Sequence, residues 1–441
     1  MSDTHSETTR AVAFVRTQML PEKAPPATSV GIIGWLRANL FSNALNTVLT
    51  IVALAFIFYI LSGLIPWMFQ SVWNADSLSE CREIISEAYG TTHGHACWAV
   101  INERWFQLTF GFYPPELVWR PILAFVLLLV ALAPVLFSDR FPRQLLVVTA
   151  AYPFVMPWLM WGGTIWGPMA AAAGFAIGYF GVRVLSPILG QLAAIIIGVV
   201  AALIWWVVLA GPVAGAIGSI LPLGITPVES RQFGGFMLSI MIGVVAIGVS
   251  LPIGIVLALG RQSNLLIVRA LCVGFIEFIR GVPLITLLFV ASTLLNIFMP
   301  PGTNFDIILR VMIMVTLFAA AYMAEVIRGG LAALPKGQYE GADSLGLNYW
   351  QAQRLIIMPQ ALKISIPGIV STFIGIFKDT VLVSIIGLLD PLGLSNAIRA
   401  DAAWNGIYWE LFAFIGAMFF IFCFGMSRYS MYLERKLKTS H

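Results

Sequence analysis

Residues 325–359 read EVIRGGLAALPKGQYEGADSLGLNYWQAQRLIIMP, the longest polar run in the C-terminal half of the chain. Apolar segments long enough to cross a bilayer flank this run on both sides. Pro335 suits a first helical turn, where its missing N–H costs little. Leu345, Tyr349 and Ala352 then follow at positions i, i+4 and i+7, which predicts one short helix with an apolar stripe. A polar helix at the surface of a membrane bundle can be held by a soluble partner.

The composition places the chain in a membrane. Of its 441 residues, 59% are hydrophobic and 10% are charged, whereas a soluble domain carries about 25% charged residues. Apolar runs of roughly 20 residues predict membrane-spanning helices rather than barrel strands. The net charge of +4 needs no nucleic-acid partner, because basic residues beside membrane helices account for it. The expected surroundings are therefore a lipid bilayer.

Apolar segments along the chain predict about ten transmembrane helices, so the expected fold class is an all-α polytopic membrane protein. The predicted spans are 44–66, 119–138, 145–161, 166–186, 191–211, 234–259, 283–299, 307–328, 366–388 and 407–427. Pro153, Pro157, Gly162 and Gly163 interrupt the third and fourth spans. A re-entrant hairpin is therefore an alternative at that point.

The basic residues orient these spans. Most of the 25 Lys and Arg residues fall on the same side as the amino terminus once ten crossings are drawn. Cytoplasmic loops carry such an excess, so both termini are predicted to be cytoplasmic and the loop 68–118 to lie outside. That loop contains Cys81 and Cys97. An oxidising compartment permits a disulfide between them, which we predict.

Three regions follow from this layout. Residues 1–43 form a polar, cytoplasmic N-terminal leader. Residues 44–225 form an extra transmembrane region that has few polar features apart from the outer loop 68–118. Residues 226–441 hold the other five spans and nearly all of the notable polar groups. The surface helix described above is predicted in this last region, at about 338–354.

The sequence lacks the motifs of the common enzyme classes. It has no G-x-x-x-x-G-K-[ST], so the chain does not hydrolyse nucleotide with a P-loop, and it has no H-E-x-x-H. His93 and His95 form an H-x-H in the loop 68–118, but an ordinary polar loop is the better interpretation. We therefore predict a protein that is not an enzyme, with no metal site and no cofactor bound by this chain.

Ionisable residues at membrane depth are costly and usually face a bundle interior or a cavity. Lys378 and Asp379 lie near the middle of the predicted span 366–388. As neighbours they point about 100° apart on a helix, so they do not pair face to face. Together with Thr380 they are candidates for the lining of a substrate path. Anchoring to neighbouring helices is the alternative interpretation.

Two acid–base pairs with helical spacing lie next to the predicted spans. Glu325 and Arg328 are three residues apart at one end of the span 307–328, and Glu277 and Arg280 repeat that spacing. We interpret the first pair as structural. After the second pair, the stretch Gly281–Pro283 predicts a bend near the membrane surface, because glycine and proline interrupt a helix.

The opening stretch resembles the EAA motif of permease subunits of bacterial ATP-binding-cassette (ABC) importers. That motif reads E-A-A, three residues, G, nine residues, I, one residue, L-P. The matching positions here, at the same spacing, are Glu340, Gly341, Ala342, Gly346, Ile356, Met358 and Pro359. Gly341 replaces an alanine of the motif and Met358 replaces its leucine.

The resemblance extends over about residues 233–435. The segments EFIRGVPLI, AEVIRGGLAALPKGQYEGADSLGL and FKDTVLVSIIG look like those of permeases for polar amino acids. The long amino-terminal extension is similar to the larger permease of the general L-amino-acid system and of its glutamate/glutamine/aspartate relatives. The resemblance implies that the last five spans form a type I ABC importer permease core in a bacterial inner membrane.

For this chain, the resemblance implies a permease subunit of a binding-protein-dependent L-amino-acid importer that forms half of the translocation path. Its partners would be a dimer of ATPase subunits that hold ATP and Mg²⁺, a second permease subunit and a periplasmic amino-acid-binding protein. The helix with the motif would couple to the ATPase. The coupling residues implied by the match and by the apolar stripe are Glu340, Gly341, Ala342, Leu345, Gly346, Tyr349, Ile356 and Pro359.

An alternative function is a self-sufficient, ion-coupled secondary transporter or a channel. Buried acids such as Asp379 would then carry protons or sodium ions. The sequence has few intramembrane acids and no evident inverted repeat, and both features disfavour this class.

Overall fold

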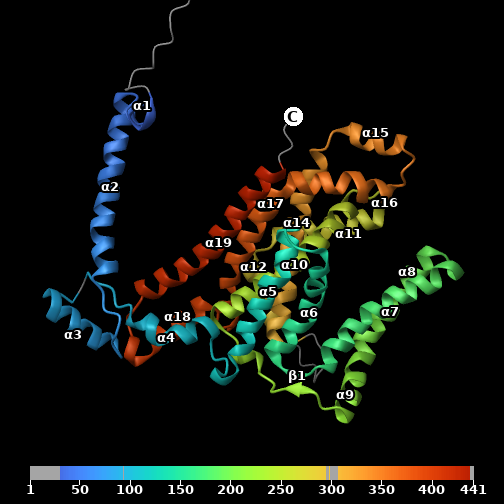
Figure 1. Cartoon of the computed structure of the whole chain (residues 1–441), viewed down its shortest axis with the longest axis horizontal. Coiled ribbons are helices and arrows are strands. Elements are labelled where there is room, and N and C mark those ends of the chain that lie inside the picture. The colour runs from blue at the N-terminus through green and yellow to red at the C-terminus, as the bar shows by residue number, and fades with distance from the viewer. Residues whose placement is uncertain (1–29, 93, 295–296, 298–305, 438–441) are drawn as a thin grey trace, which may run out of the picture. The chain divides into compact units, whose positions relative to one another are not determined.

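The computed structural model describes residues 30–92, 94–294, 297 and 306–437 (Figure 1). Contacts divide the chain into two compact units. The smaller unit comprises residues up to 71 together with 91–96, and the larger comprises 72–90 and everything from 97 onward. The predicted leader 1–43 lies mostly outside the described residues, and the three predicted regions stay predictions.

The smaller unit contains the first predicted span. Helix α1 (Gly31–Asn39) precedes α2 (Ala44–Phe69), an apolar helix of 26 residues. Asn43 caps α2, because its side chain accepts a hydrogen bond from the backbone N–H of Asn46 at 2.8 Å. Such a cap satisfies one of the free N–H groups at a helix start. The predicted span 44–66 therefore begins at its cap.

The larger unit is also built from helices. Its long helices are α5 (Trp119–Leu136), α6 (Leu146–Trp161), α7 (Trp166–Leu189), α8 (Gln191–Ile204), α9 (Ala210–Ile220), α10 (Gly235–Arg261), α11 (Leu266–Gly281), α14 (Ile307–Ala332), α17 (Met358–Asp379) and α19 (Trp409–Leu437). Over the described parts of both units, nine helical stretches are long and apolar enough to cross a membrane, and a bent pair makes ten. This confirms the all-α polytopic class.

The bent pair corrects the predicted seventh span, 283–299. Helix α11 ends at Gly281, and α12 (Leu284–Phe289) starts after Pro283 at an angle of 101° to it. The bend predicted at this stretch is confirmed. The sequence did not reveal α11 as an apolar helix that forms a bent pair with α12, because Glu277 and Arg280 lower its average hydropathy. Most of the predicted span beyond 294 lies outside the described residues.

One predicted loop contains helices. The predicted loop 68–118 holds α3 (Leu78–Tyr89) and α4 (Ala99–Phe110). The predicted fifth span, 191–211, is too short, because the helical stretch continues from α8 through a π-helical turn, Trp205–Leu209, to the end of α9.

Two short strands connect the end of α6 with the end of α9. Strand β1 (Gly163–Thr164) follows α6 and pairs antiparallel with β2 (Gly224–Ile225), which follows α9. Helices α6 and α7 each pass the length and hydropathy test for a full crossing. The turn between them therefore carries a strand pairing, and the two helices are separate spans by that test.

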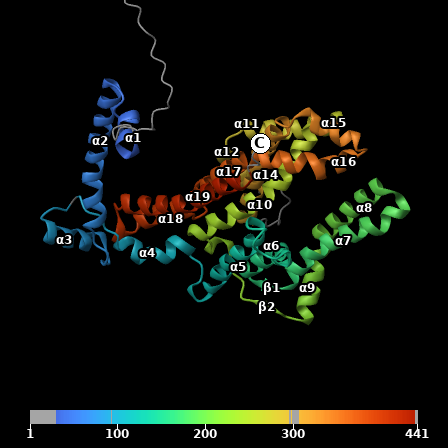
Figure 2. The same ribbon diagram turned by 45° about the horizontal axis from the view of Figure 1, so that its top comes forward.

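The centre of the bundle is α10, α14 and α17, which pack closely because small residues lie at their contacts. Gly254 of α10 faces Met323 of α14, and a side chain at Gly254 would meet Met323 at 2.7 Å. On α14, Gly330 faces Ala361 and Ser365 of α17. Glycines let helices approach in this way. Both views show α11 and the polar connection after α14 at one end of this bundle (Figures 1 and 2).

A second hydrophobic core lies at the other end of the larger unit. Buried side chains of α3 and α4 pack there with α18 (Pro391–Ala400), a following 3₁₀ turn and the start of α19. Arg104 of α4 forms an ion pair with Asp401 at 2.6 Å. Trp404 is fully buried in this core. Residues 72–90 and 97–111 thus fold onto the C-terminal helices as a cap, which we call the α3–α4 cap.

Candidate functional site

The polar connection after α14 begins with α15 (Lys336–Ser344), which follows Pro335. Two contacts hold α15 against the bundle. The side-chain amide of Gln360 on α17 donates a hydrogen bond to Gln338 at 2.8 Å. The Tyr339 hydroxyl donates to the Leu331 carbonyl of α14 at 3.4 Å, and burial raises the pKa of Tyr339. Helix α15 is therefore fastened to both neighbouring spans.

The predicted single helix at about 338–354 is wrong, because the chain turns at Gly346. This glycine has a φ of +68°, which ends α15. Its N–H donates to the Asp343 carbonyl at 2.9 Å, and the N–H of Leu347 donates to the Ala342 carbonyl at 3.3 Å. These are the two bonds of a Schellman motif. The predicted stripe crosses this break and does not form one helical face.

A new helix starts after the break. Asn348 and Gln351 form a capping box, in which each side chain bonds to the backbone N–H of the other at 3.0 Å. This fixes the start of α16 (Tyr349–Ala352). A π-helical turn, Gln353–Ile357, joins α16 to α17. The capping pattern N-x-x-Q is legible in the sequence, and it is the signal that could have located the restart.

The segment 336–359, which we call the connecting segment, has a buried face. Ala342 is 1% exposed and Ile357 is fully buried. Ile357 belongs to a hydrophobic cluster with Ile327 and Leu331 of α14 and Ala361 of α17, and Tyr339 of α15 packs against the same cluster. The segment is therefore a continuation of the bundle core rather than a free loop.

The other face of the connecting segment is exposed and largely apolar. Leu345 is 73% exposed, Tyr349 is 52% exposed and Trp350 is 70% exposed. The rings of Tyr349 and Trp350 pack edge to face at 5.3 Å. Leu355 is also exposed. Trp350 and Leu355 were not among the predicted coupling residues, although two large apolar residues in a polar stretch are a signal that the sequence contains.

The remaining motif residues lie on both faces. Glu340 and Gly341 are exposed on α15, and a side chain at Gly341 would meet no atom within 4 Å. Ile356 is half-buried in the π-helical turn, and Pro359 is exposed at the start of α17. The structure thus brings the predicted coupling residues into one short segment. Their docking role stays a prediction.

An ion-pair network lies beside this segment, at the ends of α10, α11 and α14. Glu325 of α14 pairs with Arg261 of α10 at 3.1 Å, with Arg280 of α11 at 3.6 Å and with Arg328 of its own helix. Arg261 also pairs with Glu277 of α11 at 3.0 Å. The i,i+3 pair foreseen for Glu325 and Arg328 is present. Glu277, in contrast, forms its ion pair with Arg261 of α10.

The candidate path residues lie elsewhere and are not grouped with the connecting segment. Helix α17 ends at Asp379, and a 3₁₀ helix, Thr380–Ile386, continues the chain. Lys378 and Asp379 thus lie at the junction of two helical segments within the candidate span Tyr349–Ile386, and their role in a substrate path stays a prediction. Lys378 is exposed and Asp379 is half-buried. Thr380 is fully buried, and its hydroxyl donates to the Phe377 carbonyl at 2.8 Å.

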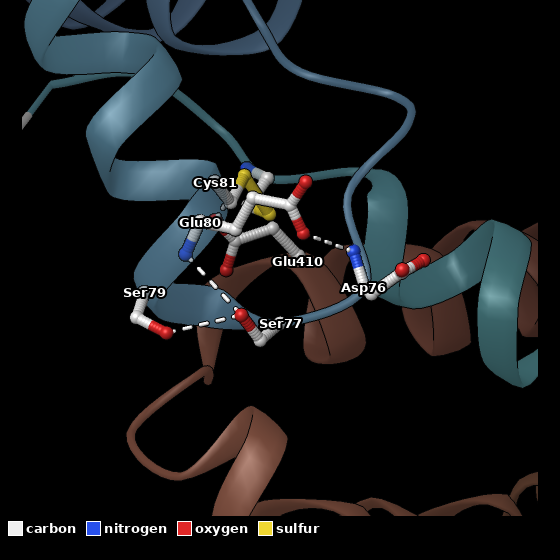
Figure 3. The surroundings of a disulfide bond; sticks show 7 residues. Asp76, Ser77, Ser79, Glu80, Cys81 and Glu410 are labelled. Atoms are coloured by element: carbon white, nitrogen blue, oxygen red, sulfur yellow. Dashed lines mark hydrogen bonds between the residues drawn. A yellow bond between two sulfur atoms is a disulfide. The ribbon is translucent and has the colours of Figure 1, made fainter.

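A disulfide joins Cys81 of α3 to Cys97, just before α4. In Figure 3, the carboxylate of Glu80 folds back and accepts a hydrogen bond from the N–H of Asp76 at 2.8 Å. The N–H of Cys97 donates to the carboxylate of Glu410, a buried residue of α19, at 3.0 Å. The disulfide therefore secures the α3–α4 cap close to its contact with α19.

Metal-ligand residues do not gather in the part of the chain that is described, where no group of three or more His, Cys, Asp or Glu side chains lies in metal-binding range. His93 of the weak H-x-H lies outside the described residues. His95 forms a hydrogen bond between its Nδ1 and the Gln70 carbonyl at 2.9 Å.

Comparison with known proteins gives consistent matches. Residues 250–439 match the family described as binding-protein-dependent transport system inner membrane component. The chain is 60% identical, over 97% of its length and 99% of the relative, to the glutamate/glutamine/aspartate/asparagine transport system permease protein BztC of Rhodobacter capsulatus. It is 40% identical, over 92% of its length and 93% of the relative, to the inner membrane amino-acid ABC transporter permease protein YhdY of Escherichia coli strain K12.

Among solved structures, the crystal structure of an amino acid ABC transporter with histidines matches at 28% identity. The alignment covers 45% of this chain and 91% of that chain, with a TM-score of 0.41.

Proposed function

Because this chain belongs to the family of amino-acid ABC transporter permeases, we propose that its connecting segment, residues 336–359, is the site at which separate ATPase subunits drive transport. The observation that carries this proposal is the division of the segment into two faces. Ala342 and Ile357 are buried on one face, where Ile357 packs with α14 and α17, while Leu345, Tyr349 and Trp350 stay exposed. An exposed aromatic and aliphatic cluster on a rigid support is typical of a protein-binding surface.

The chemistry of the exposed face suits a protein cleft. Glu340 can form charge-assisted hydrogen bonds with a basic group of the partner. A small residue at position 341, glycine here and alanine in the EAA motif, lets the partner's backbone approach α15 closely. The apolar side chains after the Gly346 turn would be buried on docking, and removing this apolar surface from water favours binding.

Motion of the connecting segment would reach the spans through its fastenings. Gln338 ties α15 to α17, and Tyr339 ties it to α14. Closure of two ATPase subunits would push two such segments together, one on each permease. Helices packed as tightly as α14 and α17 move as rigid bodies, so the push would alter the access of the path between the two permeases.

We assign ATP and Mg²⁺ to the ATPase subunits, since this chain has no P-loop. In the same proposal, a second permease completes the path and a soluble amino-acid-binding protein delivers substrate at the end that bears the α3–α4 cap. Both termini and the connecting segment would then face the cytoplasm, across a bacterial inner membrane.

The proposed substrates are acidic amino acids and their amides, because the relative at 60% identity is named for glutamate, glutamine, aspartate and asparagine. Lys378, Asp379 and Thr380 remain candidates for the path. If apolar replacement of both Lys378 and Asp379 leaves uptake and expression intact, this part of the proposal is wrong.

Charge reversal tests the coupling proposal. We expect Glu340→Lys to abolish copurification of the ATPase subunits and to stop uptake, because it puts a cation where the partner offers a basic group. Glu116→Lys is the matched control, since Glu116 is an exposed acid between α4 and α5. That control should leave copurification of the ATPase subunits unchanged. Uptake that continues without any ATPase subunit would instead support a secondary transporter.

A further inference from the structure

A cavity of about 250 Å³ lies in the larger unit, between the extra spans and the permease core. Its walls come from α5, α6, α10 and α19, and the end of α4 closes it at Thr109 and Phe110. It is separate from the connecting segment, from the ion-pair network and from the candidate path residues. The proposed transport function does not account for it.

The cavity occupies one half of the membrane-spanning region. Its wall on α5 runs over 121–128, at the start of that helix, and its wall on α10 runs over 236–244, again at the start. On α6 the wall lies over 152–160, at the end of a helix that runs the other way. All three stretches lie toward α4. The cavity is thus at hydrocarbon depth, in the half that is nearer the α3–α4 cap.

The lining disfavours polar ligands. Among the described residues, no charged side chain lines the cavity, and the Tyr152 hydroxyl already donates to the Ala124 carbonyl at 3.3 Å. A zwitterionic amino acid would lose its hydration there without gaining partners. Water needs at least two polar partners, and besides Tyr152 the lining offers only the hydroxyl of Thr109. The chemistry of the lining therefore suits a hydrocarbon.

The lining suits a flexible hydrocarbon in particular. Five of the 16 methionines of the chain line this one cavity. They are Met156, Met160, Met237, Met241 and Met418. Methionine side chains are unbranched and adapt to the shape of a mobile occupant.

The cavity is continuous with the surface that the spans present to lipid. Ile122 and Phe125 of α5 lie on its rim, with 51% and 38% of their surfaces exposed. We propose that the cavity binds an acyl chain of a membrane phospholipid, which enters sideways from the bilayer past this rim. The bound chain fills the space between the extra spans α5 and α6 and the core spans α10 and α19, and so joins the two parts.

Photocrosslinking tests the proposal on the full complex. The complex would be reconstituted in vesicles of phosphatidylethanolamine and phosphatidylglycerol that contain phosphatidylethanolamine with a diazirine on one acyl chain. After irradiation, mass spectrometry maps the adducts. We expect lipid adducts on Met237 and Met241, deep in the cavity, as well as on exposed lipid-facing residues.

Two variants from opposite walls fill the cavity, Ala124→Phe on α5 and Met418→Trp on α19. Both should remove the adducts on Met237 and Met241. Leu129→Phe adds the same ring on α5 at a 54% exposed position outside the cavity, so it should leave them unchanged. Adducts that persist in both filled variants overturn the proposal. The proposal is also overturned if Met237 and Met241 of the wild-type complex carry no lipid adducts, or if a segment of either permease covers them.

Discussion

Gly346 shows how one backbone dihedral determines the shape of the coupling surface. Its φ of +68° ends α15 and lets Asn348 start α16. A side chain in this left-handed conformation costs about 1–2 kcal/mol. We therefore expect Gly346→Ala to shift the Leu345 and Tyr349 side chains and to weaken the binding of the ATPase subunits. The weaker binding can be measured by copurification at increasing concentrations of the ATPase subunit.

Gly341 provides the matched control for that substitution. It lies within α15, and a methyl group there would meet open space. Gly341→Ala should stabilise α15 by up to about 1 kcal/mol, because alanine favours a helix more than glycine does. ATPase binding should stay the same or improve. Equal losses from both alanine variants would show that bulk on this face, rather than the turn, limits docking.

Asp390 makes the stability of the cap region depend on pH. It is fully buried ahead of α18, and it accepts hydrogen bonds from the N–H groups of Leu392 and Gly393. Burial raises its pKa from 3.8 to about 6, and the two hydrogen bonds only partly oppose this. The folded protein thus holds a proton that the unfolded chain has already released. The free energy of unfolding should therefore fall by about 3 kcal/mol as pH rises from below 3.8 to above about 6.

Thermal unfolding of the purified complex between pH 4 and pH 7 checks the effect of Asp390. Asp390→Asn keeps a side chain that caps α18 but cannot ionise. Its Tm should lack the part of the pH dependence that the carboxyl group causes. The proposed role of Asp390 would be contradicted if the Tm of the wild type rose from pH 4 to pH 7 and the Tm of Asp390→Asn showed the same pH dependence.

Among the elements, α10, α11 and α14 are joined through one carboxylate. Glu325 pairs with three arginines and is 23% exposed, whereas Glu277 pairs with Arg261 alone and is 53% exposed. Partly exposed pairs contribute only about 0.2–1 kcal/mol each. Glu325→Gln should therefore lower the Tm of the complex clearly more than Glu277→Gln does. Equal shifts for the two variants would mean that Glu325 does not act as a shared acceptor.

Element positions could be predicted where one apolar run makes one helix, as in α2 and α10. Prediction failed where the structure depends on a turn or on partners far along the chain. The bend of 101° after α11 was anticipated from the Gly281–Pro283 stretch, but α11 itself was hidden by its polar residues. The EAA spacing predicted the coupling residues along the chain, and their role stays a prediction. It gave no information about the break at Gly346, because spacing does not report a φ angle.

At the scale of the whole molecule, the α3–α4 cap could not be foreseen. The hydrogen bond from Cys97 to Glu410 joins residues 313 positions apart, and no local pattern predicts such a pairing. Hydropathy therefore suggested an outer loop where the chain folds back onto α18 and α19. The cavity between α5, α6, α10 and α19 has the same origin, since its walls come from distant segments.

The disulfide is expected to stabilise this cap as a unit. Cys81 and Cys97 are 16 residues apart, and closing a loop of about that size is worth about 3 kcal/mol. Replacing both cysteines by serine should therefore expose residues 72–90 and 97–111 to proteolysis, while the spans stay protected in the membrane. Limited proteolysis of the reconstituted complex measures the change. Cys423→Ser removes a free, half-buried cysteine of α19 and is the matched control. If the double variant resists protease as well as this control does, then the packing against α18 and α19 holds the cap without the disulfide.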